Sequence, residues 1–246
     1  MTWLLTLAFD GNEYCGFQVQ PNGRSVAAAF QDGLEAVIGR RPDIKGCSRT
    51  DAGVHALGFA LSFEADLRIP PEKLPLALNT KLPRDIRVLS ARVVPDGFHA
   101  RYAAHTKTYL YRIRNSPIDS PFEERYYCRI PGRLDVERMQ RAAAHFVGTH
   151  DFLALCAAHS SAAAHGDTVR TITACGAERH GDTVEITVTA DGYLYNMGRI
   201  LAGALCEAGA GRLDPEAVPA ILASRDRRLA GPTLPAKGLF LHHVDY

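Results

Sequence analysis

Apolar and polar residues alternate with the period of a β-strand at the start of the chain. Odd positions from Trp3 to Phe9 carry large apolar side chains and share one strand face. From Val26 to Ile38 apolar residues recur at helical spacing instead, after Ser25 and before Gly39. This pattern predicts a strand followed by an amphipathic helix that stops at Gly39.

The same periodicities predict further elements along the chain. Strands are expected at residues 43–47, 58–64, 85–94, 107–114, 169–180, 183–190 and 238–244, and helices at 70–82, 135–146, 195–210 and 214–223. Small residues dominate 156–169, which we expect to be a mobile loop. The order predicts an α+β fold of two similar halves, residues 1–104 and 105–246, with one sheet face free for a ligand.

Composition narrows the class of protein. The 246 residues are 46% hydrophobic and 22% charged, as in an ordinary folded domain. The 28 Lys and Arg residues nearly cancel the 27 Asp and Glu residues, so any nucleic-acid site must be a local patch. We expect neither secretion nor membrane spanning, because the first residues lack a basic region and no apolar run is long enough.

Cysteine and histidine spacing gives no sign of a metal site. The six cysteines form no CxxC pair, and the ten histidines form no HExxH pattern. We therefore expect reduced thiols, a cytoplasmic location and no bound metal.

One turn is polar where its flanking segments are apolar. It lies between the predicted strands at 43–47 and 58–64 and reads SRTDAGVHA, residues 48–56. Arg49 stands two residues before Asp51, so a cation lies beside a carboxylate where backbone can approach a ligand closely. Taken alone, the turn also fits an ordinary surface loop with a weak ion pair.

The wider sequence resembles one enzyme family in several segments. SRTDAGVHA resembles the GRTDxGVHA motif of the TruA family of pseudouridine synthases. In the same order, YCGFQVQPNGRSV (14–26), FHARYAAHTKTYLYRI (98–113), YLYNMGRILAGAL (193–205) and the tail PAKGLFLHHVDY are similar to that family's other motifs. The matches span almost the full chain.

The resemblance implies a fold and an activity. The expected fold is that of pseudouridine synthases, in which two ferredoxin-like (RRM-like) halves share a mixed, mainly antiparallel sheet with helices on one face. The implied reaction is isomerisation of uridine to pseudouridine in tRNA, at positions 38, 39 and/or 40 of the anticodon stem-loop. It also implies a homodimer, with tRNA as partner and neither membrane nor cofactor.

The resemblance also assigns roles to individual residues. Asp51 is expected to be the catalytic carboxylate, as nucleophile or as base, and the sequence leaves that choice open. Tyr109, Arg49 and Arg199 are expected to bind the substrate where they converge with Asp51 in one cleft. Tyr109 suits stacking on an extruded base, and Tyr111 takes its place if the strand register is shifted. Further phosphate contacts are expected from Arg101, His105, Lys107, Arg112, Arg114, Arg225, Arg227 and Arg228.

Some positions depart from the family pattern, and other functions stay open. Ser48, Phe17 and Gly198 replace the usual Gly, Trp and Val, but none of these changes removes a reactive group. The alternative from another class is a non-catalytic RNA-binding module of RRM-like architecture. A hydrolase that uses Asp51 with His55 is a further alternative, although no nucleophile elbow supports it.

Overall fold

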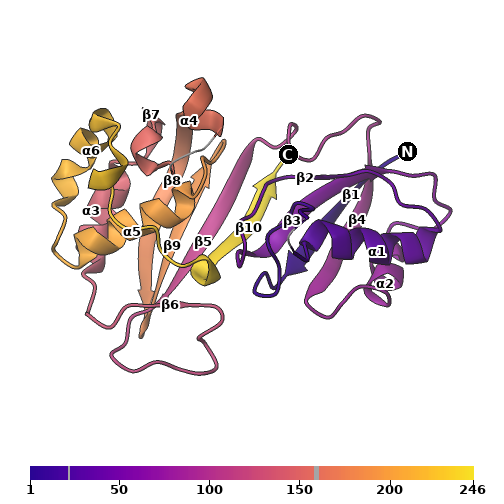
Figure 1. Cartoon of the computed structure of the whole chain (residues 1–246), viewed down its shortest axis with the longest axis horizontal. Helices are drawn as coiled ribbons and strands as arrows, with labels where there is room; N and C mark the ends of the chain where they lie inside the picture. Colours follow the sequence, from indigo (N-terminus) through magenta and orange to yellow (C-terminus); the bar gives the residue numbers. More distant parts are fainter. Residues whose placement is uncertain (22, 158–160) are drawn as a thin grey trace. The chain divides into compact units, whose positions relative to one another are not determined.

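The computed structural model describes residues 1–21, 23–157 and 161–246 (Figure 1). The chain divides into two compact units. The first consists of Met1–His105 together with Phe240–Tyr246, and the second consists of Thr106–Leu239. The end of the chain therefore clusters with its beginning.

A mainly antiparallel sheet forms the centre of the first unit. Strand β1 (Thr2–Phe9) lies between β4 (Ile86–Val94) and β3 (His55–Glu64) and is antiparallel to both. Strand β2 (Ile44–Gly46) pairs antiparallel with one end of β3. The other end of β3 pairs in parallel with β10 (Leu239–Asp245), which places Phe240 opposite His55.

Two helices cover one face of this sheet (Figure 1). Helix α1 (Val26–Ile38) begins where the Ser25 side chain accepts the Ala28 N–H, and it ends at Gly39, whose φ is 74°. Helix α2 (Leu74–Asn79) is shorter. The core under these helices contains large buried side chains that alternate along β1 and β3: Trp3, Leu5, Leu7, Phe59, Leu61 and Phe63.

The second unit repeats the plan of strands covered by helices. Its sheet has the order β5 (Thr106–Arg114), β9 (Thr183–Ala190), β8 (Val169–His180) and β7 (Gly148–Asp151), with antiparallel neighbours. Strand β6 (Cys128–Arg129) pairs in parallel with β5. The helices are α3 (Val136–Ala144), α4 (Ser161–His165), α5 (Met197–Gly209) and α6 (Val218–Ser224), with short 3-10 turns at Leu153–Leu155, Pro215–Ala217, Arg227–Leu229 and Ala236–Gly238.

The α+β class predicted from the sequence is confirmed, and so are the predicted strands. Two predictions were wrong in part. The helix expected at 70–82 forms only over Leu74–Asn79, because Pro70–Lys73 and the residues after Asn79 form turns. Of the loop expected at 156–169, residues 158–160 lie outside the described residues, while Ser161–His165, rich in the strong helix former alanine, is helical.

Within the described residues, none of the helices is long and apolar enough to cross a membrane. The cysteines are free thiols.

Candidate active site

The turn that carries Asp51 is closed by its own backbone. The Val54 N–H donates to the Asp51 carbonyl over 3.2 Å. Between them Gly53 has a φ of 76°, the left-handed conformation that the third position of a type II turn requires. Val54 is buried and Asp51 is half-buried. The turn therefore places Asp51 at the boundary between the interior of the unit and solvent.

A second segment, residues 11–17, supports this turn through backbone hydrogen bonds. The Phe17 N–H donates to the Thr50 carbonyl over 3.2 Å, and the Gly53 N–H donates to the Tyr14 carbonyl over 3.3 Å. Gly16 lies so close that a Cβ atom there would stand 2.5 Å from the Thr50 oxygen. The backbone on both sides of Asp51 is therefore held by residues far from it in sequence.

His55 anchors the C-terminal end of the turn. Its side chain is 1% exposed, and its ring stacks on Phe240 of β10 with centroids 4.6 Å apart. Its Nδ1 atom accepts the Gly11 N–H over 3.1 Å and lies 3.2 Å from Asp10 Oδ1. This buried position gives His55 a structural role and does not support the hydrolase alternative that paired it with Asp51.

Arg49 lies two residues before Asp51 and is exposed. An exposed guanidinium can donate to a phosphate, which is the substrate-binding role expected for Arg49.

Tyr109 lies in the second unit, on strand β5. It pairs in register with Val188 of β9, is 7% exposed, and packs edge-on against Tyr193 with centroids 4.7 Å apart. Tyr193 is itself fixed, because its hydroxyl donates to the carbonyls of Val188 and Lys107. Tyr109 is thus largely buried, and its ring packs against a tyrosine that is itself held in place.

Tyr111, the alternative to Tyr109, belongs to the core. It is 2% exposed, and its hydroxyl donates to the Pro235 carbonyl over 2.7 Å. Burial raises the pKa of Tyr111, so the hydroxyl stays protonated. With its ring buried and its hydroxyl bonded inside the unit, Tyr111 has no surface left for a base.

Arg199 lies in the first turn of α5. Its Nε donates to the Leu234 carbonyl over 2.7 Å, and its Nη1 donates to Asn196 Oδ1 over 2.9 Å. Asn196, the residue before the helix, has a φ of 61°, which is uncommon for a residue with a side chain. The side chain of Arg199 is therefore held in place by neighbours on both sides.

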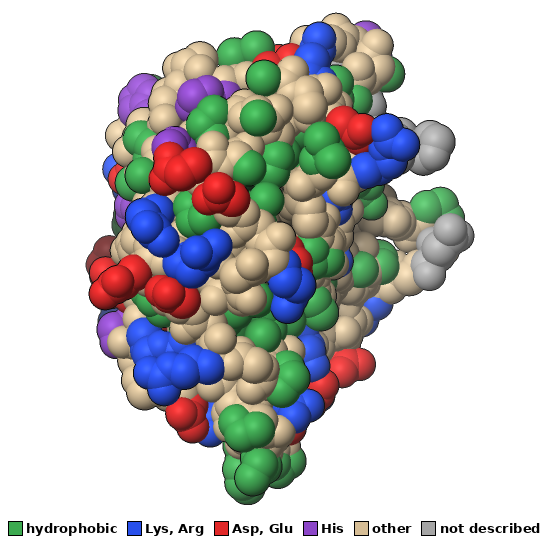
Figure 2. Space-filling view, turned by 90° about the vertical axis from the view of Figure 1, so that its left-hand side faces the viewer, with side chains coloured by type: hydrophobic (Ala, Val, Ile, Leu, Met, Phe, Trp, Pro, Cys, Tyr) green, Lys and Arg blue, Asp and Glu red, His purple; other side chains and the backbone are tan. Residues whose placement is uncertain are grey.

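Several arginines expected at phosphates are instead paired with carboxylates. Arg112 bonds to Glu185, Arg114 to Glu123 and Asp182, Arg225 to Asp151, and Arg228 to Asp226. Figure 2 shows, without identifying single residues, that basic and acidic side chains are interspersed on one face of the second unit. The negative charge of each paired carboxylate offsets the positive charge of its arginine. The pairs therefore weaken the phosphate contacts expected from these arginines.

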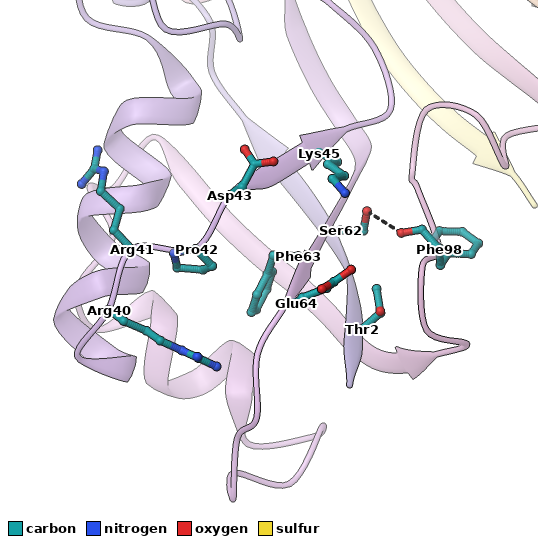
Figure 3. Close-up of a pocket in the computed structure, with 10 residues that line it drawn as sticks. All are labelled: Thr2, Arg40, Arg41, Pro42, Asp43, Lys45, Ser62, Phe63, Glu64 and Phe98. Atoms are coloured by element: carbon teal, nitrogen blue, oxygen red, sulfur yellow. Dashed lines mark hydrogen bonds between the residues drawn. The ribbon is translucent and has the colours of Figure 1, made fainter.

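A pocket in the first unit lies apart from the Asp51 turn (Figure 3). It has a volume of about 380 Å³ and mixes cations with carboxylates. Its lining is Thr2, Arg40, Arg41, Pro42, Asp43, Lys45, Ser62, Phe63, Glu64 and Phe98. Arg41 is already paired with Asp32 and Glu35, and none of the lining residues belongs to the turn. This pocket is therefore not the candidate catalytic site.

Among the described residues, no cluster of three or more His, Cys, Asp or Glu side chains could hold a metal ion. The residues that support the turn were not predicted from the sequence: Asp10, Gly11, Tyr14, Gly16 and Asp85. The available signal was the Gly-containing segment YCGFQVQPNGRSV, whose resemblance to a family motif marked it without giving it a role.

Similarity to known proteins decides whether this chain is an enzyme or a non-catalytic RNA-binding module. The sequence profile described as tRNA pseudouridine synthase matches residues 6–103 and 142–246. The chain belongs to the tRNA pseudouridine synthase family. Asp51, Arg49 and Arg199 lie within the matched ranges, whereas Tyr109 lies between them.

Full-length relatives support this membership of the tRNA pseudouridine synthases. The tRNA pseudouridine synthase A of Moorella thermoacetica is 46% identical, over 98% of each chain. That of Caldicellulosiruptor saccharolyticus is 41% identical over 99% of this chain and 98% of its own, and that of Bacillus pumilus is 41% identical over 98% and 97%. The resemblance indicated by the motifs is thus confirmed.

Proposed function

We propose that this chain isomerises uridine in tRNA to pseudouridine, with Asp51 as the catalytic residue. Family membership supports the reaction. The assignment of Asp51 rests on the turn that carries it. Backbone hydrogen bonds from segment 11–17 hold this turn before and after Asp51, and Asp51 is half-buried. A fixed carboxylate is what a reaction needs when one group must meet one carbon at a defined geometry.

The isomerisation of uridine requires few catalytic groups from the protein. The bond from ribose C1′ to uracil N1 breaks, the base turns, and C1′ bonds to C5. The C5 proton is lost and N1 gains one, so product and substrate are isomers and no electrons are exchanged. One carboxylate suffices, either as a nucleophile or as a base, and no cofactor is required.

The substrate-binding roles follow the same proposal. Tyr109 would stack on the extruded base and bond to the substrate through its hydroxyl. Arg49 would bind a backbone phosphate, and Arg199 would contribute a cation held by Leu234 and Asn196. We further propose that the uridines are at positions 38, 39 and/or 40, that the enzyme is a homodimer, and that it acts in the cytoplasm. Its free cysteines are consistent with that compartment.

The first test is tritium release from tRNA labelled at C5 of uridine, because that label is lost only when C5 becomes the glycosidic carbon. The wild-type protein is expected to release tritium, and Asp51→Asn is expected to release at least about a thousandfold less while still binding tRNA, because an amide can act neither as the nucleophile nor as the base. Asp66→Asn, which alters an exposed carboxylate of the same unit, is the matched control and should keep full activity.

Each contrary result has a meaning. Activity retained in Asp51→Asn would remove the catalytic assignment. Tight tRNA binding by the wild type with no release would favour the non-catalytic RNA-binding module.

Tyr109→Phe tests the role of Tyr109 in the same assay. The ring and its stacking survive this change, but the hydroxyl is lost, so kcat/KM is expected to fall about tenfold, the effect of one hydrogen bond. Tyr127→Phe, which removes a hydroxyl from a half-buried tyrosine of the same unit, should change kcat/KM by less than about twofold. Equal values for the two variants would argue against a substrate contact by the Tyr109 hydroxyl.

A further inference from the structure

Tyr14 links the Asp51 turn to a distant strand. Its carbonyl accepts the Gly53 N–H over 3.3 Å, two residues after Asp51. Its hydroxyl donates to Asp85 Oδ1 over 2.7 Å, just before β4. Tyr14 thus connects the turn, through its backbone carbonyl, to the edge strand of the sheet, through its side-chain hydroxyl. Asp85 is 71 residues away from Tyr14 in sequence.

We propose that Tyr14 is a positioning residue for catalysis, and that its hydroxyl bond to Asp85 fixes the carbonyl that holds the Asp51 turn. This inference rests on the proposed function, because it assigns Tyr14 a role through Asp51.

The contacts around Tyr14 leave it little freedom. Its N–H donates to the Gly11 carbonyl, and the guanidinium of Arg24 lies over its ring, 4.9 Å from the centroid. Asp85 is fixed as well, since its carbonyl accepts the Asp10 N–H over 2.9 Å and its Oδ2 lies 4.0 Å from Arg24. The acceptor of the Tyr14 hydroxyl is therefore part of the folded sheet rather than of a loose loop.

The hydroxyl of Tyr14 stays protonated at neutral pH and can therefore donate to the Asp85 carboxylate. Burial, and then the bond to Asp85, raise the pKa of Tyr14 well above its ordinary value. The side chain is 3% exposed, so it cannot contact a tRNA directly. Any effect of Tyr14 on the reaction must pass through the backbone that it holds.

Loss of the hydroxyl should therefore affect turnover rather than binding. In Tyr14→Phe the ring remains but the link to Asp85 is broken, so the turn gains freedom and Asp51 meets its target carbon less often. We expect kcat for tritium release to fall about tenfold, because small misplacements of a reacting group are costly, while KM and the Kd for tRNA stay within about twofold.

Tyr246→Phe is the matched control. Tyr246 lies in the same unit, and its hydroxyl donates to the Ala100 carbonyl over the same 2.7 Å, outside the segment that supports the turn. Both variants should lower Tm by about 2–4 °C, the effect of one lost hydrogen bond in a protein of this size. Only Tyr14→Phe should lower kcat.

The acceptor provides a second pair of variants. Asp85→Asn keeps an oxygen that can accept from the Tyr14 hydroxyl and is expected to keep kcat within about threefold of wild type. Asp85→Leu removes the acceptor and should lower kcat as much as Tyr14→Phe does. Combining Tyr14→Phe with Asp85→Leu should add little to either change, because both break the same link.

Different results would contradict the positioning role of Tyr14 and the proposed function. A kcat for Tyr14→Phe equal to that of Tyr246→Phe, or a loss confined to tRNA binding, would overturn the positioning role. Failure of the proposed function would instead appear as a wild-type protein that releases no tritium, or as an active Asp51→Asn variant.

Discussion

Gly16 and Gly39 both have a positive φ, yet they should respond very differently to a side chain. At Gly16 (φ 110°) a Cβ atom would stand 2.5 Å from the Thr50 carbonyl oxygen, whereas nothing lies within 4 Å of a Cβ atom at Gly39 (φ 74°). We expect Gly39→Ala to cost about 1 kcal/mol of unfolding free energy, from backbone strain alone. Gly16→Ala should cost about 3 kcal/mol or more, because strain and overpacking add.

Urea denaturation would measure both values, and tritium release would show whether Gly16→Ala also displaces Asp51. Similar unfolding free energies for the two variants would contradict the close approach of Gly16 to the turn.

Single residues were predictable where the signal was local. The candidate Asp51 and its turn stood out because polar and small residues replaced an apolar pattern within nine positions. The supports of the turn were not predictable, because the pairing of Tyr14 with Asp85 joins residues 71 positions apart, and no short-range pattern encodes such a contact. The sequence likewise offered His55 only as the partner of Asp51 in the hydrolase alternative, whereas the contacts of His55 come from Phe240 of β10 and from Gly11.

Within helix α5, two glycines give opposite predictions. A Cβ atom at Gly203 would stand 2.0 Å from the Pro232 carbonyl oxygen, so Gly203→Ala should lower the unfolding free energy by about 3 kcal/mol or more. At Gly198 the nearest atom would be a Leu239 methyl carbon at 3.6 Å, an ordinary contact. Gly198→Ala should therefore raise stability by up to about 1 kcal/mol, since alanine favours a helix.

Thermal and urea unfolding of the two variants would check the contrast. If Gly203→Ala were neutral, the close packing of α5 on the segment at Pro232 would be wrong. If Gly198→Ala were destabilising, the departure of Gly198 from the family pattern would reflect a steric need rather than a tolerated loss of helix propensity.

Elements were predictable where periodicity and end signals agreed. Helix α1 has a clear apolar stripe, Ser25 before it and Gly39 after it, and the structure uses both as caps. Helix α2 was predicted too long because its apolar residues continue into turns that Pro70 and Pro83 favour. Strands β6 and β7 were missed, since two and four residues are too few to show a period and depend on their neighbours for pairing.

For the whole molecule, the sequence predicts the total charge but not which charged side chains pair. The near balance of 28 basic and 27 acidic residues predicts that the molecule has no broad positive field. Which arginines keep their charge for a ligand depends on carboxylates brought close by folding, such as Glu185 beside Arg112 and Asp151 beside Arg225. The amino-acid composition gives the number of these charges, but the ion pairs between them form only in the folded chain.

The return of β10 to the first unit has a consequence during synthesis. The ribosome makes Asp51 and His55 early, yet Phe240, on which the His55 ring stacks, emerges only after the entire second unit has been made. His55 and Phe240 are 185 residues apart in the sequence. At roughly 5–20 residues per second this separation corresponds to a delay of about 9–37 s. Until β10 exists, a nascent chain already carries the Asp51 carboxylate proposed for catalysis but lacks the Phe240 ring on which His55 stacks, so uridine modification is expected to begin only after β10 has been made.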